Sequence, residues 1–231
     1  MYRFLRDEVG PREIQFIPGV EPNDVRTVAP QKWNEETLPV FNSRGAHPGN
    51  PESVVTDWSV DPDDWGYFLR RVWDDWLRHD FGKVIVNLFE TAIAQWMGKD
   101  AQICVYHEFC GKGSALEHDG SLCSCDHYVY PEYRLGNILE RSSSRMAFSQ
   151  EQMDFGLAKF STLPKRCRDC EFLFACNGEC PKNRLIRTPE GEPGLNYLCS
   201  GLMRFWNHID RDAKEIARSI ARGEAFDRRR L

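Results

Sequence analysis

The sequence predicts an α/β segment followed by a cysteine-rich α+β region with a β-hairpin and a C-terminal helix. Three observations support this fold class. Helix and strand patterns alternate in residues 1–99, as in a parallel α/β layer. All nine cysteines lie between residues 104 and 199. A separate apolar pattern with helical spacing closes the chain from residue 202.

The composition is that of a folded chain with a hydrophobic core. Its 231 residues are 41% hydrophobic and 12% aromatic, which excludes a disordered protein. The net charge of −5 gives no electrostatic support to a nucleic-acid partner. No apolar run approaches the ~20 residues that a membrane span needs, and the stretch MYRFLRDEVGPREIQF has no apolar signal-peptide core. We therefore expect a cytoplasmic protein with neither a membrane nor a nucleic acid as partner.

The first elements predict a chain that begins within a larger α/β architecture. Residues 2–9 have the pattern of the last turns of a helix, which Gly10 ends in the left-handed conformation. A strand is expected at 13–18, and a helix that leads directly into a strand is half of a βαβ unit. Residues 19–58 are rich in Pro, Asn and Gly and predict an inserted loop.

The next elements repeat this alternation. Asp61 is the expected N-cap of a helix, with Pro62 at its first position. A continuous apolar stripe then predicts a buried helix face, made of Trp65, Phe68, Leu69, Val72, Trp73, Trp76 and Leu77. The run KVIVNLF (83–89) is typical of a buried strand, and 90–98 predicts a helix that Gly98 ends.

The cysteine-rich region has fewer periodic segments. The run GSALEHDGSLCSCDH (113–127) predicts a β-hairpin, because Asp119 and Gly120 form a two-residue turn signal between alternating arms. From 202 to about 222 the chain predicts a helix with one apolar side, made of Phe205, Trp206, Ile209, Ala213, Ile216 and Ile220.

The cysteines are the strongest functional signal. Their odd number and the lack of a signal peptide argue against disulfides and favour metal ligation. Without Cys123, eight remain, enough for two sites of four thiolates, which suit either Zn²⁺ or a [4Fe–4S] cluster. Zinc ribbons use two CxxC pairs, and only one is present. The run C-x2-C-x5-C-x3-C over 167–180 is closer to ferredoxin spacing, in which the last cysteine serves the other cluster. The spacing favours iron and leaves zinc open.

Two stretches carry a likeness to a known family. CGKGSALEHDGSLCSCDHYVYPEYRLGNI (110–138) and LPKRCRDCEFLFACNGECPKNR (163–184) resemble the SPASM domain of anaerobic sulfatase-maturating enzymes, which belong to the radical S-adenosylmethionine superfamily. The likeness extends over most of the chain except 21–53. It implies that residues 1–99 are the last strand–helix units of an α/β partial barrel. Residues 100–231 would be a SPASM domain that carries the hairpin and the closing helix.

The resemblance also implies two auxiliary [4Fe–4S] clusters. One would be held by Cys104, Cys110, Cys125 and Cys180, and the other by Cys167, Cys170, Cys176 and Cys199. Cys123 departs from the family pattern. It lies two residues before Cys125 and so on the same face of the hairpin, and we interpret it as a small buried apolar residue rather than a rival ligand.

Asp126 is the candidate for acid–base chemistry. Strand neighbours point to opposite faces, so Cys125 would face the cluster and Asp126 would point away from it, toward the barrel. The resemblance implies that this Asp deprotonates the side chain that is modified. The alternative is an Asp that bonds the backbone at a strand end.

One feature of the superfamily is missing from the sequence. S-adenosylmethionine is bound there at a third [4Fe–4S] cluster held by C-x3-C-x2-C, and the only C-x3-C here, Cys176 to Cys180, is followed at that spacing by Asn183. The resemblance therefore implies a C-terminal portion that is inactive alone. Its partners would be a sulfatase polypeptide, oxidised at Ser or Cys to formylglycine, and the missing N-terminal barrel half. A structural zinc module and a non-catalytic subunit that recruits a sulfatase or a partner are the alternatives.

Overall fold

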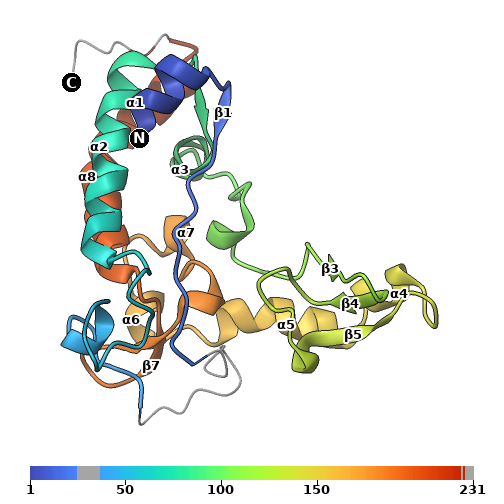
Figure 1. Ribbon diagram of the computed structural model, residues 1–231. Helices are drawn as coiled ribbons and strands as arrows, with labels where there is room; N and C mark the ends of the chain where they lie inside the picture. Colours follow the sequence, from blue (N-terminus) through green and yellow to red (C-terminus); the bar gives the residue numbers. More distant parts are fainter. Residues whose placement is uncertain (25–36, 225, 227–231) are drawn as a thin grey trace.

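The structure is a computed structural model that describes residues 1–24, 37–224 and 226. Two long helices, α2 (Pro62–His79) and α8 (Cys199–Ala221), lie side by side, and α3 (Asn87–Trp96) packs against α8 (Figure 1). An arm that carries a small sheet projects from this body (Figure 1). None of the described helices combines the length and the apolar composition that crossing a membrane requires.

The two long helices form close to where the sequence predicts them. The Asp61 carboxylate caps α2 by accepting the Asp63 N–H at 2.8 Å, with Pro62 at the first position. Helix α8 begins at Cys199, three residues before the predicted start. Ile220, predicted on its apolar side, lies in the last turn and is 44% exposed. That one position of the predicted buried stripe is wrong.

The first strand pair is parallel, as the alternation predicts. Helix α1 (Tyr2–Phe4) continues as a π-helical turn, η1 (Leu5–Val9), and ends at Gly10, whose φ is 67°. Strand β1 (Glu13–Ile14) then pairs with β2 (Ile85–Val86), with Glu13 opposite Ile85. The predicted strands 13–18 and 83–89 are too long. The second is wrong from Asn87 onward, where α3 begins, because a short apolar run suits a buried helix as well as a strand.

One large core joins residues from both sides of position 99. The Trp73 ring lies 5.1 Å from the Phe89 ring, and the Phe89 ring lies 5.8 Å from the Phe205 ring. All three side chains are fully buried. The helix pair is therefore fixed by aromatic packing, and Cys199 at the start of α8 is fixed with it.

The arm contains an antiparallel sheet of three short strands. These are β3 (Ala115–Leu116), β4 (Ser121–Cys123) and β5 (Arg134–Asn137), in that order. The predicted hairpin is present, but its loop has three residues, 118–120, instead of the predicted two. The Glu117 N–H donates to the Ser121 carbonyl at 2.8 Å, and Gly120 adopts a φ of 84°. Strand β4 ends at Cys123 after a register shift between Leu122 and Cys123.

The remaining elements are short. Helices α4 (Ser143–Ala147) and α5 (Gln150–Ser161) follow the sheet, and α6 (Lys165–Arg168) and α7 (Leu173–Cys176) lead to a strand pair, β6 (Ile186–Arg187) with β7 (Pro193–Leu195). The 3₁₀ turns are η3 (Arg44–Ala46), η4 (Cys104–Tyr106), η5 (Pro131–Tyr133) and η6 (Pro181–Asn183).

The predicted inserted loop has little regular structure in its described part. It contains η3 and is joined to the body by a bridge between Val40 and Arg187. Part of this predicted loop, 25–36, lies outside the described residues.

Candidate metal centres

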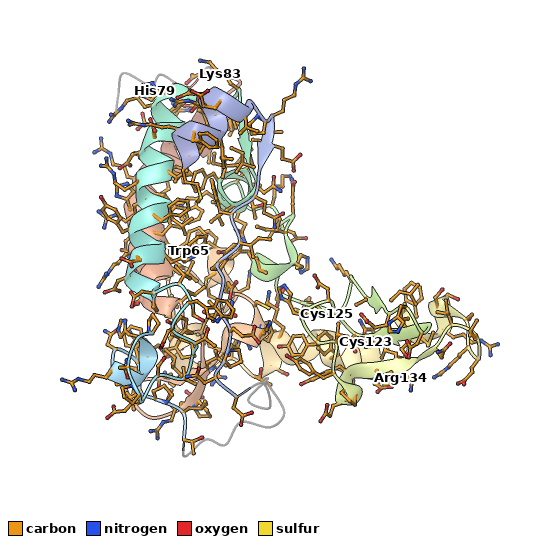
Figure 2. The ribbon with its side chains drawn as sticks, in the orientation of Figure 1. Trp65, His79, Lys83, Cys123, Cys125 and Arg134 are labelled. Carbon is orange, nitrogen blue, oxygen red and sulfur yellow. The ribbon has the colours of Figure 1, made fainter. Side chains whose placement is uncertain are left out.

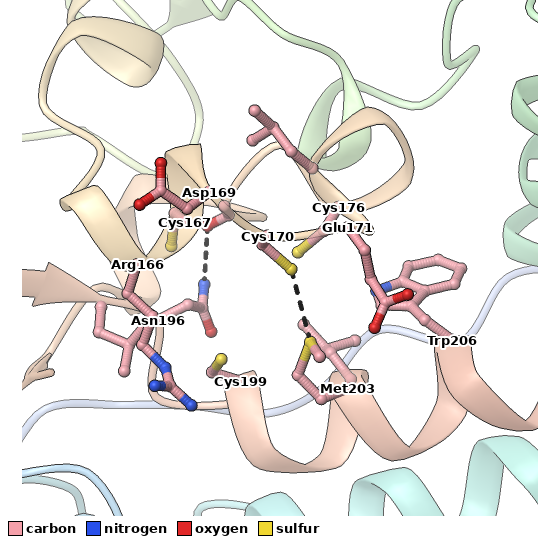
Figure 3. Close-up of a pocket in the computed structure, with 14 residues that line it drawn as sticks. Arg166, Cys167, Asp169, Cys170, Glu171, Cys176, Asn196, Cys199, Met203 and Trp206 are labelled. Carbon is pink, nitrogen blue, oxygen red and sulfur yellow. Dashed lines mark hydrogen bonds between the residues drawn. The ribbon is translucent and has the colours of Figure 1, made fainter. Parts of the chain in front are cut away.

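Four cysteines surround one cavity beside the first turn of α8. Cys167 of α6, Cys170, Cys176 of α7 and Cys199 of α8 line a cavity of about 340 Å³. Their sulfur atoms face a common space, with Met203 one turn along α8 (Figure 3). The Cys170 thiol lies 3.7 Å from the Met203 Sδ atom. The structure thus brings together the whole of one predicted set, hereafter the second set.

The other predicted set comes from four separate segments. Cys104 begins η4, Cys110 follows it, Cys125 lies after β4, and Cys180 precedes η6. The Cys110 thiol interacts electrostatically with each of the other three thiols. Cys110 and Cys125 also pack against the same small aromatic cluster, which consists of Tyr128, Tyr133 and Phe155. These four cysteines, hereafter the first set, also lie near one another.

Cys123 lies apart from both sets. Its side chain is buried, and the charged groups that act on it are Glu117, Arg134 and Asp119 of the hairpin. Figure 2 shows Cys123 in the arm, near Arg134. Because β4 ends at Cys123, strand alternation does not extend to Cys125 and gives no support to the predicted shared face.

The second set fits an iron–sulfur cluster better than a single ion. All nine cysteines lie in the described residues, and each is a free thiol. Tetrahedral zinc at about 2.3 Å from each sulfur would bring the four sulfurs within about 4 Å of one another. Within the described ranges no three His, Cys, Asp or Glu side chains gather around a point in that way. The second set instead encloses a cavity, which is the space that four irons and four sulfides require.

Burial keeps several of these thiols protonated when no metal is bound. It raises the pKa of Cys125 and of Cys176 to about 12 and the pKa of Cys167 to about 11. Since thiolates are the ligands, metal binding must displace these protons. Backbone N–H groups favour the thiolates by donating to three of the sulfurs: His127 to Cys125, Gly178 to Cys176 and Lys182 to Cys180.

Asp126 differs from the prediction in its relation to Cys125. It lies in a turn after β4, and its Oδ1 atom accepts a hydrogen bond from the Cys125 thiol at 3.1 Å. The prediction that these neighbours point to opposite faces is therefore wrong, because β4 has already ended. The Cys125 hydrogen bond holds the pKa of Asp126 below its usual range. The carboxylate lines a second cavity, of about 220 Å³, whose lining also includes residues 15–18 after β1.

Two buried charges near the first set were missed from the sequence. Lys159, on α5, is 1% exposed, and its Nζ donates to the carbonyls of Cys104 at 2.9 Å and Val105 at 2.8 Å. Glu179 is also buried, and its Oε2 accepts from Asn196 at 2.7 Å and from Asn183 at 3.0 Å. Burial raises the pKa of Glu179, and these two hydrogen bonds oppose that effect.

The third missed residue is Arg184, which is fully buried. Its Nε donates to the Gly178 carbonyl at 3.4 Å, and its Nη1 donates to Thr162 Oγ1 at 3.1 Å. Its Nη2 is buried without a hydrogen-bond partner among the described residues. No sequence pattern indicates this burial. The position of Arg184 four residues after Cys180 is the only local signal.

The turn from Cys176 to Cys180 joins the two sets. Its three inner residues are all left-handed, with φ of 47° at Asn177, 68° at Gly178 and 51° at Glu179. This conformation costs roughly 1–2 kcal/mol at each non-glycine residue. The Gly178 carbonyl also accepts from Asn196 at 3.3 Å (Figure 3). The turn thereby gives Cys176 to the second set and Cys180 to the first.

The sequence is similar to those of known iron–sulfur proteins. Residues 104–171 match the SPASM family, described as an iron–sulfur cluster-binding domain. A serine-type anaerobic sulfatase-maturating enzyme of Bacteroides thetaiotaomicron is 41% identical over 208 residues, which cover 90% of this chain and 47% of the relative. A cysteine-type anaerobic sulfatase-maturating enzyme of Clostridium novyi is 24% identical over 223 residues, or 96% of this chain and 52% of the relative.

The fold has a matching solved structure. Native anSMEcpe with bound AdoMet and Cp18Cys peptide aligns with a TM-score of 0.70 at 22% identity, over 95% of this chain and 53% of that one. The chain spans about half the length of the curated relatives it matches. It is therefore related to the C-terminal part of the anaerobic sulfatase-maturating enzymes, and its residues 104–171 match the SPASM family of iron–sulfur cluster-binding domains.

Proposed function

We propose that this chain provides two auxiliary [4Fe–4S] clusters to an anaerobic sulfatase maturase. The grouping of eight cysteines into two sets of four, with Cys123 apart, is the observation that carries this proposal. The first set would hold one cluster and the second set the other. The cavity of the second set and the SPASM match both support iron rather than zinc.

The complete enzyme would contain further parts. We propose that residues 1–99 are the last units of an α/β barrel and that residues 100–231 are its auxiliary domain. The other barrel half would supply the S-adenosylmethionine site and a third [4Fe–4S] cluster, since the sequence printed here has no C-x3-C-x2-C. Such a protein would work in a reducing compartment, the cytoplasm, where its thiols stay free.

The substrate would be a sulfatase polypeptide, oxidised at a Ser or Cys to formylglycine. When bound, the auxiliary clusters supply buried one-electron acceptors, which this two-electron oxidation requires after the first hydrogen atom has been removed. Asp126 would take the proton from the side chain being oxidised. A carboxylate with an ordinary pKa is ionised at neutral pH, which is the state that a proton acceptor needs.

Cluster binding would also free this carboxylate. In the metal-free chain the Cys125 thiol donates its proton to Asp126 Oδ1. A thiolate ligand has no proton to donate, so ligation of Cys125 leaves Oδ1 able to accept a proton from a substrate. The cavity between Asp126 and residues 15–18 offers a place where a side chain could reach it.

Metal analysis tests the proposal. After anaerobic reconstitution we expect about eight irons and about eight sulfides per chain, with the electron paramagnetic resonance (EPR) signal of reduced [4Fe–4S] clusters. About two zincs and negligible iron in protein purified without oxygen would overturn the proposal and leave a structural zinc module. About four irons would show that one of the two sets is not a cluster site.

A further inference from the structure

Arg184 is a buried cation for which the described residues provide no ion pair. Its guanidinium bonds a carbonyl and a hydroxyl, both neutral, and Nη2 has no partner there. An uncompensated buried charge costs several kcal/mol in proteins. A protein that keeps one in its interior needs an anion there. Four thiolates around an iron–sulfur core make a net anion in either redox state, so a bound cluster is an anion of the required kind.

The guanidinium lies between the two candidate sites. It is bonded to Gly178 at the centre of the turn that joins Cys176 to Cys180. Gly178 lines the cavity of the second set, and a Cβ atom on it would lie 2.8 Å from Arg184 Nη2. The arginine head therefore lies directly behind the cavity wall, at the point where the chain passes from one set to the other.

The thiols around Arg184 come from both sets. It interacts electrostatically with Cys167 of the second set and with Cys180 and Cys110 of the first. Two other cations in this region interact most strongly with the thiols of one set each. Lys159 acts on Cys110 and Cys180, and the exposed Arg166 acts on second-set thiols, those of Cys167 and Cys199.

We propose that Arg184 is a positioning residue shared by both cluster sites, whose cation compensates the charge of the two clusters and raises the reduction potential of each. This inference rests on the proposed function. Reduction adds one electron to a group that is already negative, so a cation in a water-free position stabilises the reduced form. Both clusters gain this stabilisation because the guanidinium lies near ligands of both sets.

A redox titration of the reconstituted full chain with dithionite, followed by EPR and visible absorbance, tests this role. In Arg184→Met we expect about eight irons to remain and both potentials to fall. The ratio of reduced to oxidised cluster at a fixed potential should drop about tenfold, which is ~59 mV for a one-electron couple. Arg184→Lys keeps the charge, so both of its reduction potentials should stay near the wild-type values. Two further variants assign the two reduction steps of the titration to their clusters. Cys104→Ala should keep only the second cluster, and Cys199→Ala should keep only the first.

Two matched variants remove a cation from one site only. Lys159→Met should lower only the reduction potential of the cluster in the first set. Arg166→Met should lower only that of the cluster in the second set, and by less, because Arg166 is exposed to solvent. The inference is overturned if Arg184→Met changes only one of the two reduction potentials, or neither.

Loss of clusters is also informative. If Arg184→Met fails to hold iron while Arg184→Lys holds both clusters, both sites need the charge and the inference stands. If Arg184→Lys loses them too, the role of Arg184 is packing and the inference fails. Wild-type chain without iron–sulfur clusters would overturn the proposed function as well. If the wild-type chain holds eight irons but the Arg184 variants have unchanged reduction potentials, this inference alone is overturned.

Discussion

Gly66 of α2 and Gly201 of α8 meet backbone to backbone. A Cβ atom on Gly66 would lie 2.6 Å from the Cα atom of Gly201, and one on Gly201 would lie 1.9 Å from the carbonyl oxygen of Pro62. No side chain fits at this crossing. Because Cys199 is two residues from Gly201, the crossing also fixes a ligand of the second set relative to the main core.

Gly201→Ala is expected to weaken both the fold and the second site. The added methyl group meets backbone, so α8 must move, at a cost of about 1–3 kcal/mol. Cys199 moves with it, and iron should fall toward about four per chain. Urea unfolding and iron analysis measure the two effects. Gly113→Ala is the control, since a Cβ there meets nothing within 4 Å. Equal stability of the two variants would contradict this close contact between the two helices.

Cysteine variants should divide the iron in a definite way. Cys180→Ala should remove the first cluster and leave the second, so that about four irons remain. Cys123→Ala should keep about eight, because Cys123 lies apart from both sets. Its buried thiol behaves as a small apolar group, so only a modest loss of stability is expected. Loss of iron in Cys123→Ala would show that the first set has been assigned wrongly.

Iron removal should loosen the arm more than the body. The arm has two small cores, each of three buried residues, whereas the helical body has a large one. Ligation must therefore supply much of the folding free energy of the arm. Hydrogen exchange before and after chelation should show the largest loss of protection in residues 107–161. Unchanged protection in β4 and β5 of the metal-free chain would contradict this expectation.

Glu90 should give a pH-dependent effect that does not involve the clusters. It lies in the first turn of α3, and burial raises its pKa. Ionisation at neutral pH therefore costs folding free energy, and Glu90→Gln should raise the free energy of unfolding near pH 7. As the pH falls, the carboxyl is protonated first in the folded state, at the raised pKa, and then in the unfolded state, at the ordinary value of 4.5. Below both values the gain in the free energy of unfolding of Glu90→Gln should vanish.

Urea unfolding at the two pH values measures this difference. Glu151→Gln, at an exposed position in the first turn of α5, is the control and should give no gain. A gain for Glu90→Gln that persists below pH 4.5 would assign the effect to packing rather than to charge.

The sequence printed here should not cleave S-adenosylmethionine. Reductive cleavage needs a cluster with an open iron, and the two sets use every cysteine except Cys123. Reconstituted chain with dithionite and S-adenosylmethionine should yield no 5′-deoxyadenosine by chromatography. A chain extended by the N-terminal barrel half is the positive control. Multiple turnovers by this chain alone would mean that one of the two sets holds a cluster with an open iron.

The long helices could be predicted because their signals are local. Asp61 and Pro62 define the start of α2, and repeated apolar positions define its buried face. The hairpin turn at Gly120 is local too. Strand ends are not local, since β1 and β2 pair across some seventy residues and end where the pairing ends. The prediction for Asp126 failed for this reason, because it assumed a strand longer than β4.

The buried charges could not be predicted from local sequence at all. Arg184 is buried because Thr162 and Gly178 meet around it, and Lys159 because the carbonyl of Cys104 turns toward it. Each of these contacts joins separate segments of the chain. Cysteine spacing alone gives only the number of sites, two of four thiolates each. The membership of the two sets is an expectation from the family resemblance, and no sequence signal points to the cations between them.

The turn from Cys176 to Cys180 also limits how the chain length can vary. Each of its inner residues has a contact of its own: Asn177 donates to the Tyr106 carbonyl at 2.8 Å, Gly178 accepts from Arg184, and Glu179 accepts from Asn196. An insertion or deletion here would rotate one thiol out of its site. The fourteen residues between Cys110 and Cys125 include a hairpin tip that can lengthen without moving either ligand. Alignment gaps among homologues should therefore fall in the hairpin tip, and the three-residue interval should be invariant in length.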